Sequence, residues 1–196
     1  MGWIFYGLAI LSSMRSKDPS TQVGACIVDK NNKIVSVGYN GAPIGFDDDK
    51  DMKWDREGDF VNTKYAYVCH SELNAILNSR VNVDGCKLFV TLFPCNECAK
   101  VIIQSGIKEV IYLSDKYNGT KENIVAKKLL DTCKVKYREY KKNNKEIKIE
   151  LSNSMIDSSS NISSSFSTDI FNFLHRFNIS LTVLFTSVAY SNTLII

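Results

Sequence analysis

The stretches C-H-S-E (residues 69–72) and P-C-N-E-C (residues 94–98) contain the residues on which the predicted function of this sequence depends. They offer one imidazole, from His70, and two thiols, from Cys95 and Cys98. Three such ligands with an open fourth position are typical of a catalytic zinc site, because a structural site takes a fourth protein ligand. The carboxyl group of Glu72 is not needed as a ligand, so we predict that it works beside the metal.

Each motif falls where the sequence predicts the start of a helix. Residues 69–79 and 96–105 have helical patterns, and Pro94 suits the position just ahead of a helix, where a missing N–H costs nothing. Backbone amides and the helix dipole at such a position favour the thiolate form of Cys95 and Cys98. The two sulfurs of C-x-x-C can then hold one ion from a single turn, with His70 reaching it from the second helix start.

Two alternatives compete with the catalytic site: a structural zinc knot, and a C-x-x-C pair that holds no metal. A knot would need a fourth ligand. Cys69 is adjacent to His70 and could not easily point at the same ion, and His175 lies in a serine-rich tail. The catalytic interpretation is therefore preferred. The other cysteines, Cys26, Cys86 and Cys133, are more simply explained as core residues.

The remaining sequence predicts an α/β fold. We expect a helix over residues 3–14, a hairpin of strands 23–29 and 33–39, strands over 86–93, 107–113 and 135–140, and a helix over 121–132. Strands that alternate with helices after an opening hairpin favour an α/β sandwich around a central sheet. Residues 1–150 are predicted to form this domain, and residues 151–196 a low-complexity tail, disordered or aberrant.

A long irregular connection is expected over residues 40–66. A loop of this length in a compact domain is usually functional or disordered. Its acidic residues between Asp47 and Asp59 are interpreted as a solvated surface in preference to a second metal site.

Composition and charge restrict the partners. The formal net charge is only +3, without the basic excess of a nucleic-acid-binding protein. Residues 179–196 are interrupted by polar side chains and make a poor membrane span. We therefore expect neither a nucleic-acid nor a membrane partner. Thiolate ligands need a reducing compartment, which favours a cytoplasmic location.

The spacing H-x-E with P-C-x-x-C is the known signature of zinc-dependent nucleobase deaminases. In that chemistry Glu72 would take a proton from water and deliver it to a ring nitrogen and then to the leaving ammonia. The predicted reaction is hydrolytic deamination of an amino-pyrimidine or an amino-purine.

Segments around the motifs resemble the deoxycytidylate (dCMP) deaminase family of the cytidine-deaminase-like superfamily. They are R-S-K-D-P-S-T-Q-V-G-A-C-I-V (15–28), V-G-Y-N-G-A-P-I-G (37–45), T-K-Y-A-Y-V-C-H-S-E-L-N-A-I (63–76), L-F-P-C-N-E-C-A-K (92–100) and S-G-I-K-E-V-I-Y-L-S-D-K-Y (105–117). The resemblance implies a three-layer α/β/α sandwich with a central mixed sheet of about five strands. It also implies conversion of dCMP to dUMP with one Zn²⁺, in a homohexamer activated by dCTP and inhibited by dTTP.

The resemblance also suggests residues for the nucleotides. Asn40 matches the substrate-contacting asparagine of the family, and Arg15 and Lys17 are candidates for its phosphate, which a guanidinium binds bidentately. The loop Asn40, Gly41, Pro43 and Gly45 is expected to contribute to the regulatory site, where Mg²⁺ could accompany the nucleotide.

Two positions depart from the family pattern. Ser71 stands where alanine is common, with no loss of activity expected, and Phe46 stands where cysteine is common, which could alter nucleotide control. Two other functions remain open: a deaminase for cytosine, a nucleoside or tRNA, and a catalytically silent subunit that binds zinc and nucleotide. The intact Glu72 argues against the silent subunit.

Overall fold

The computed structural model describes residues 2–46, 50–51, 53–141, 148–150 and 193–195. Its contacts divide the chain into two units, Met1–Lys142 and Asn143–Ile196. The first unit contains the helices α1 (Gly2–Ser13), α2 (Ser71–Asn78), α3 (Asn96–Gln104) and α4 (Lys121–Thr132), and the strands β1 (Gly24–Val28), β2 (Ile34–Tyr39), β3 (Lys87–Leu92), β4 (Glu109–Ser114) and β5 (Lys136–Glu139). All nine elements that the sequence predicts in this unit are confirmed, with their ends shifted by a residue or two.

The five strands form one mixed sheet in the order β2-β1-β3-β4-β5. β1 runs antiparallel to both β2 and β3, whereas β3, β4 and β5 are parallel to one another. Parallel neighbours need a crossover connection, and α3 and α4 supply the two crossovers. The central mixed sheet of five strands is confirmed.

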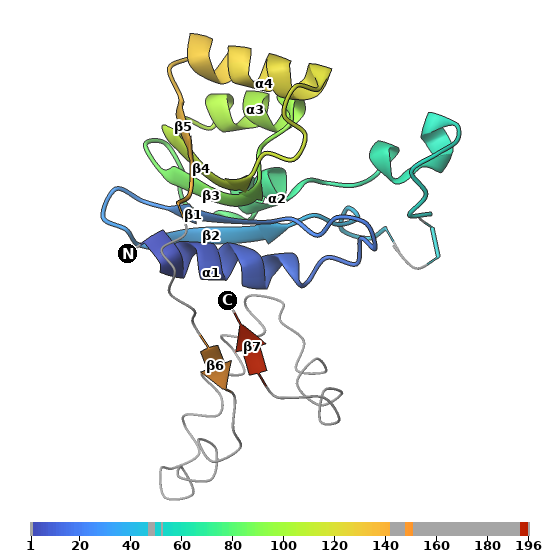
Figure 1. Ribbon diagram of the computed structural model, residues 1–196, viewed down its shortest axis with the longest axis horizontal. Helices are drawn as coiled ribbons and strands as arrows, with labels where there is room; N and C mark the ends of the chain where they lie inside the picture. The colour runs from blue at the N-terminus through green and yellow to red at the C-terminus, as the bar shows by residue number, and fades with distance from the viewer. Residues whose placement is uncertain (1, 47–49, 52, 142–147, 151–192, 196) are drawn as a thin grey trace, which may run out of the picture. The chain divides into compact units, whose positions relative to one another are not determined.

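Helices cover both faces of the sheet, with α1 on one face and α2, α3 and α4 on the other (Figure 1). Successive side chains of a strand point to opposite faces. In β1, Cys26 and Val28 pack with residues of α1, whereas Ala25 and Ile27 belong to the cluster on the other side. The alternation produces two separate apolar cores, so the predicted three-layer α/β/α sandwich is confirmed.

One edge of the sheet collects the segments that carry the motifs. The register pairs Gly24 with Tyr39, so β1 begins where β2 ends. It also pairs Leu92 with Ser114, so β3 and β4 end at the same level. The segment before β1 and the segments that follow β2, β3 and β4 therefore leave the sheet together.

The long connection between β2 and α2 leaves the body of the first unit and returns to it. Residues 53–68, called the arm below, contain the two 3₁₀ helices η1 (Phe60–Asn62) and η2 (Lys64–Ala66) and extend to the side of the sheet (Figure 1). Gly41 and Cys69 close the excursion with two backbone hydrogen bonds of 3.1 and 2.8 Å. The connection that the sequence predicts as irregular is thus anchored at its base.

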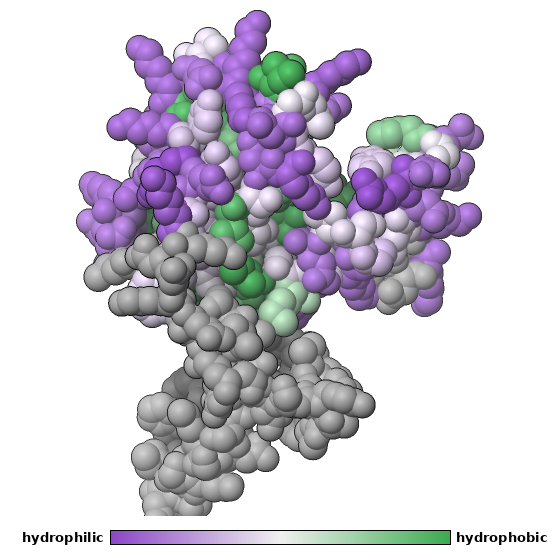
Figure 2. Space-filling model, in the orientation of Figure 1, coloured by the Kyte–Doolittle hydropathy of each residue, from purple (hydrophilic) through white to green (hydrophobic). Residues whose placement is uncertain are grey.

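The second unit contributes the antiparallel pair β6 (Lys148–Glu150) and β7 (Thr193–Ile195). Apart from β7, the predicted low-complexity tail and His175 lie outside the described residues. The visible face of the first unit is largely hydrophilic around α4, with few apolar side chains among the polar ones (Figure 2). Among the described residues no helix has both the length and the apolar character that crossing a membrane requires.

Candidate active site

Both predicted ligand motifs lie at helix starts on the same edge of the sheet. His70 is the residue immediately before α2, and Cys95 is the residue immediately before α3. Both have extended backbone angles, which turn the chain from a strand or loop into the helix. Cys98 is the third residue of α3, one turn after Cys95, and is buried. The predicted placement of the three residues at two helix starts is what the structure has.

The three donor atoms converge. His70 Nδ1 lies 3.4 Å from the Sγ of Cys95 and 3.3 Å from the Sγ of Cys98. A tetrahedral centre with bonds of about 2.0–2.3 Å separates its ligand atoms by about 3.5 Å, so these spacings fit one zinc ion. All three donors lie within 4.8 Å of one another, and within the described residues Cys69 and Glu72 do not join them. The set is therefore a candidate Zn²⁺ site with three protein ligands and room for a fourth.

Without metal, the donors hold one another in a charged arrangement. The hydrogen bond with Cys98 contributes most to lowering the pKa of Cys95 to about 4, and His70 acts in the same direction against the effect of burial. The hydrogen bond with Cys95 raises the pKa of His70 to about 9. The hydrogen bond between Cys98 and Cys95, together with burial, raises the pKa of Cys98. Cys95 is thus already a thiolate at neutral pH, the form that a metal needs.

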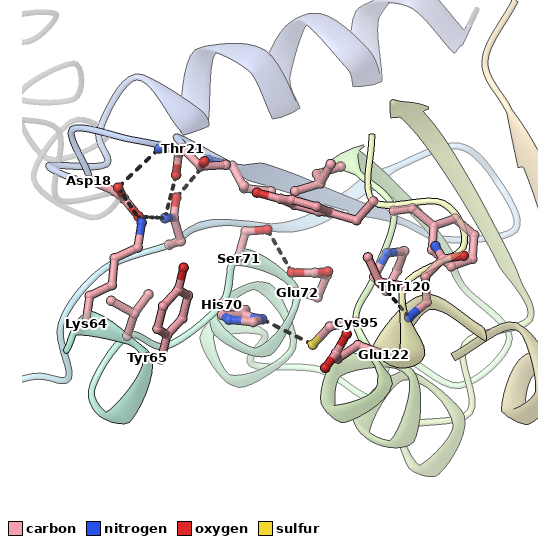
Figure 3. Close-up of a pocket in the computed structure, with 18 of the residues that line it drawn as sticks. Asp18, Thr21, Lys64, Tyr65, His70, Ser71, Glu72, Cys95, Thr120 and Glu122 are labelled. Carbon is pink, nitrogen blue, oxygen red and sulfur yellow. Dashed lines mark hydrogen bonds and ion pairs between the residues drawn. The ribbon is translucent and has the colours of Figure 1, made fainter. Parts of the chain in front are cut away.

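Glu72 lies beside this cluster on the first turn of α2. Its side chain is buried, with 4% of its surface exposed, and burial raises the pKa of its carboxyl group. Its Oε2 accepts a hydrogen bond of 3.0 Å from Ser71 Oγ. Figure 3 shows Glu72 near Cys95, on the side away from Asp18 and Lys64. A carboxyl group with a raised pKa, buried beside a metal site, suits proton transfer.

A pocket of about 320 Å³ opens onto these residues, within the size range of small-molecule sites. Its walls come from the edge segments, the arm and the start of α4. The lining residues are Asp18, Thr21, Val23, Asn40, Arg56, Lys64, Tyr65, Val68, His70, Ser71, Glu72, Leu92, Phe93, Pro94, Cys95, Tyr117, Thr120, Glu122 and Asn123.

The structure separates the predicted nucleotide-binding residues. Asn40 lines the pocket, but Arg15 and Lys17 are not among its lining residues. The guanidinium of Arg15 lies 5.5 Å from the centre of the Tyr39 ring and 3.5 Å from its hydroxyl. The assignment of Arg15 and Lys17 to a phosphate therefore stays a prediction.

The residues proposed for regulation form the turn that begins the arm connection. Gly41 pairs with Cys69 through the backbone, the carbonyl of Pro43 accepts a hydrogen bond of 3.1 Å from the Phe46 amide, and Gly45 has a φ of 86°. Only Asn40 of this set lines the pocket. A regulatory role for Asn40, Gly41, Pro43 and Gly45 stays a prediction.

Several pocket residues were not singled out from the sequence. Arg56 lies within the acidic stretch that was interpreted as a solvated surface, yet its side chain lines the pocket and donates from Nε to the Tyr65 hydroxyl at 3.1 Å. Lys64 and Tyr117 fall inside segments that carry the family resemblance, which was the only signal for them. Asp18 lies in the segment 15–28, which also carries the family resemblance, and neither its charge nor its spacing distinguishes it within that segment.

Comparisons with known proteins agree with this geometry. The family model described as "Cytidine and deoxycytidylate deaminase zinc-binding region" matches residues 4–114. The deoxycytidylate deaminases of Homo sapiens and Mus musculus are each 54% identical to this chain over 138 residues, covering 69% of this chain and 77% of each relative. The crystal structure of the dCMP deaminase from cyanophage S-TIM5 in complex with dCMP and dUMP is 28% identical, with a TM-score of 0.56, and the match covers 71% of this chain and 96% of that one.

Proposed function

We propose that this chain, which belongs to the cytidine and deoxycytidylate deaminase family, hydrolyses dCMP to dUMP and ammonia. One observation carries the proposal: a His/Cys/Cys donor set and a buried carboxyl group meet at a pocket of about 320 Å³. The relatives named deoxycytidylate deaminase and the phage enzyme crystallised with dCMP and dUMP support the choice of substrate.

His70, Cys95 and Cys98 are the residues that would hold the zinc ion. When bound there, zinc supplies Lewis-acid chemistry and lowers the pKa of a water molecule from about 16 towards about 7. Glu72 would accept a proton from the attacking water on its carboxylate and donate it to N3 of the cytosine ring. The oxygen of that water bonds to C4, and its second proton passes through the same carboxyl group to the amine as the C4–N bond breaks, so that water and dCMP become dUMP and ammonia.

Arg56 is a further candidate for the substrate phosphate. A guanidinium has five N–H donors, and the Nε of Arg56 is the one bonded to Tyr65, so its terminal nitrogens can still face an anion. Lys116, whose Nζ is 3.3 Å from Thr21 Oγ1, could add a second positive charge from the segment after β4. Arg15 and Lys17 remain the candidates that the sequence suggests.

The family resemblance supports further proposals about regulation and assembly. We propose that the chain assembles into a homohexamer and that dCTP activates it and dTTP inhibits it at the turn of residues 40–45. Mg²⁺ would bind with the regulatory nucleotide. A cytoplasmic location is proposed because thiolate ligands need a reducing compartment.

We also propose that residues 1–150 are the deaminase domain and that residues 151–196 are dispensable for its chemistry. The division of contacts after Lys142 supports a boundary in this region.

A substrate panel tests the assignment. The purified full chain is mixed separately with dCMP, deoxycytidine and cytosine, and ammonia release is followed with and without dCTP or dTTP. We expect the fastest turnover with dCMP. Faster turnover of deoxycytidine than of dCMP would contradict the assignment, and a zinc-loaded protein inactive on all three would indicate the silent subunit.

A further inference from the structure

Lys64 and Asp18 form a buried ion pair in the wall of the pocket. Lys64 Nζ lies 2.8 Å from Oδ1 and 2.6 Å from Oδ2 of Asp18, and the two side chains are 7% and 3% exposed. Lys64 belongs to the arm, whereas Asp18 belongs to the segment before β1. The pair therefore joins two walls of the pocket that are 46 residues apart in sequence.

The pair extends to the side chain of Asn40. Asn40 Nδ2 donates to Asp18 Oδ2 at 3.3 Å and to the carbonyl of Thr21 at 2.9 Å, and Asn40 Oδ1 accepts from the amide of Val23 at 2.7 Å. A flipped amide would place its oxygen against a carboxylate and a carbonyl, so this network admits one orientation. Both N–H groups are used, and one lone pair of Oδ1 is left for a ligand. Asn40 can then accept a hydrogen bond from a ligand, but it has no donor left to offer.

We propose that Lys64 and Asp18 are positioning residues that fix the Asn40 amide as an acceptor for a sugar hydroxyl of the nucleotide. This inference rests on the proposed function. A sugar hydroxyl is the donor that suits this place, because the cytosine amino group must reach Glu72, and Figure 3 shows Asp18 and Lys64 well apart from Glu72 and Cys95. The positive charge of Lys64 is already compensated by Asp18 at 2.6 Å, so we assign the pair to the sugar in preference to the phosphate.

The test replaces the pair by apolar side chains of similar size, Lys64→Met with Asp18→Leu, because such replacements usually preserve the fold where loss of one partner would not. Lys64→Arg, which keeps the charge, is the conservative variant. Lys108→Met is the matched control, since Lys108 forms an exposed pair with Asp84 at 3.9 Å and does not line the pocket. For each protein we would measure kcat and KM for dCMP and deoxycytidine, the Kd for dUMP, zinc content and the melting temperature.

For the double variant we expect KM for both substrates and the Kd for dUMP to rise about 10-fold, the effect of one misdirected hydrogen bond. We expect kcat to stay within about threefold and zinc content to be unchanged, since the zinc donors are not in this network. Lys64→Arg, which keeps the charge, should retain most of the wild-type affinity for dUMP and both substrates, and Lys108→Met should behave like the wild type.

Three results would overturn the inference: an unchanged Kd for dUMP, a loss confined to dCMP, which would assign the pair to the phosphate, or a fall in zinc content together with kcat, which would make its role purely structural. A wild type that binds dUMP but does not turn over dCMP would refute the proposed function alone. In that case the dUMP affinities of the variants still decide whether the pair positions Asn40.

Discussion

Ser71 donates a hydrogen bond from Oγ to Oε2 of Glu72 at 3.0 Å, and both side chains are buried at the start of α2. Ser71 is completely buried, so water cannot replace its hydroxyl. The contact restrains the carboxyl group that is proposed to carry the proton. It also identifies the partner of a residue that the sequence marks only as a departure from the family pattern.

Ser71→Ala should therefore weaken catalysis mildly. Loss of one buried hydrogen bond is expected to lower the free energy of unfolding by about 1 kcal/mol and kcat by about 2- to 10-fold, with KM little changed. Ser36→Ala is the matched control, because Ser36 is also buried and donates to the carbonyl of Ala75 in the same helix. The control should lose similar stability and keep its kcat. Equal kcat values for both variants and the wild type would show that the Ser71 bond does not hold Glu72 in its working position.

Glu72→Gln should separate metal binding from proton transfer. The amide has nearly the shape of the carboxyl group but cannot accept and return a proton, so kcat for dCMP should fall by about 100- to 10,000-fold. Zinc content should stay at the wild-type level, because Glu72 lies outside the cluster of donor atoms. Elemental analysis and ammonia release measure the two properties independently. Loss of zinc from this variant would identify Glu72 as a ligand instead.

Zinc removal should make Cys95 chemically reactive. At pH 6 the metal-free protein should present Cys95 as a thiolate, because its interactions with Cys98 and His70 lower its pKa to about 4. Iodoacetamide should then modify Cys95 in chelator-treated protein and not in zinc-loaded protein, and turnover should return when zinc is added back before labelling. Peptide mass spectrometry locates the label.

Two other cysteines are internal controls in the same experiment. Cys133 is exposed at the end of α4, so its interpretation as a core residue was wrong, and it should react in both samples. Cys26 is fully buried, and burial raises its pKa to about 12, so it should react in neither. Equal labelling of Cys95 with and without zinc would argue against its role as a ligand.

The Asp18–Lys64 pair should contribute to the acid sensitivity of the fold. Burial raises the pKa of Asp18, but the hydrogen bond from Lys64 and those from the amides of Ser20 and Thr21 outweigh this effect and hold the pKa below its ordinary value. The unfolded chain then binds the proton at higher pH than the folded chain does. The stabilisation is present above about pH 4, the ordinary pKa of aspartate, and is lost as the pH falls towards the lower folded value.

Denaturant unfolding of the wild type and of the Lys64→Met, Asp18→Leu double variant, from about pH 6 down to about pH 3, measures this contribution. The free energy of unfolding should fall more steeply below about pH 4 in the wild type than in the double variant. The candidate zinc ligands are the same in both proteins, so a loss of zinc in acid should affect both alike and cancel in the comparison. Parallel curves would show that Asp18 does not titrate at a lower pH in the folded state.

The sequence could predict the candidate zinc ligands because the geometry within each motif is local. Cys95 and Cys98 are one helical turn apart, and His70 precedes a helix in the same way as Cys95 does. Spacing within one turn nearly determines where such side chains point. The strands could be predicted equally well, because their short apolar runs are bounded by turns.

The other residues that line the pocket could not be predicted in this way, because their positions depend on where the arm rejoins the body of the first unit. Lys64 meets Asp18 only after the connection has closed on itself at Gly41 and Cys69, and no periodicity marks that event. Arg15 stays a predicted phosphate ligand, and in this structure its guanidinium lies 5.5 Å from the centre of the Tyr39 ring.

The position of α2 relative to the sheet gives the last prediction. A Cβ at Gly38 of β2 would lie 2.3 Å from the amide nitrogen of Ala75 and 2.4 Å from the carbonyl oxygen of Ser71, both in the backbone of α2. Gly38→Ala must therefore push away the helix that carries Glu72 and follows His70. Such overpacking costs typically about 1–3 kcal/mol of stability.

Gly24→Ala is a control of the same kind on the opposite face, because a Cβ at Gly24 of β1 would lie 1.9 Å from the carbonyl oxygen of Ala9 in α1. Both variants should melt at lower temperature than the wild type. Only Gly38→Ala should also lose zinc and kcat per folded molecule, since a displacement of about 1 Å at a catalytic group can cost about 100-fold in rate. Zinc content and kcat, measured well below both melting temperatures, show whether the two variants differ. An equal loss from both variants would mean that the site responds to the stability of the whole fold and not to the placement of α2.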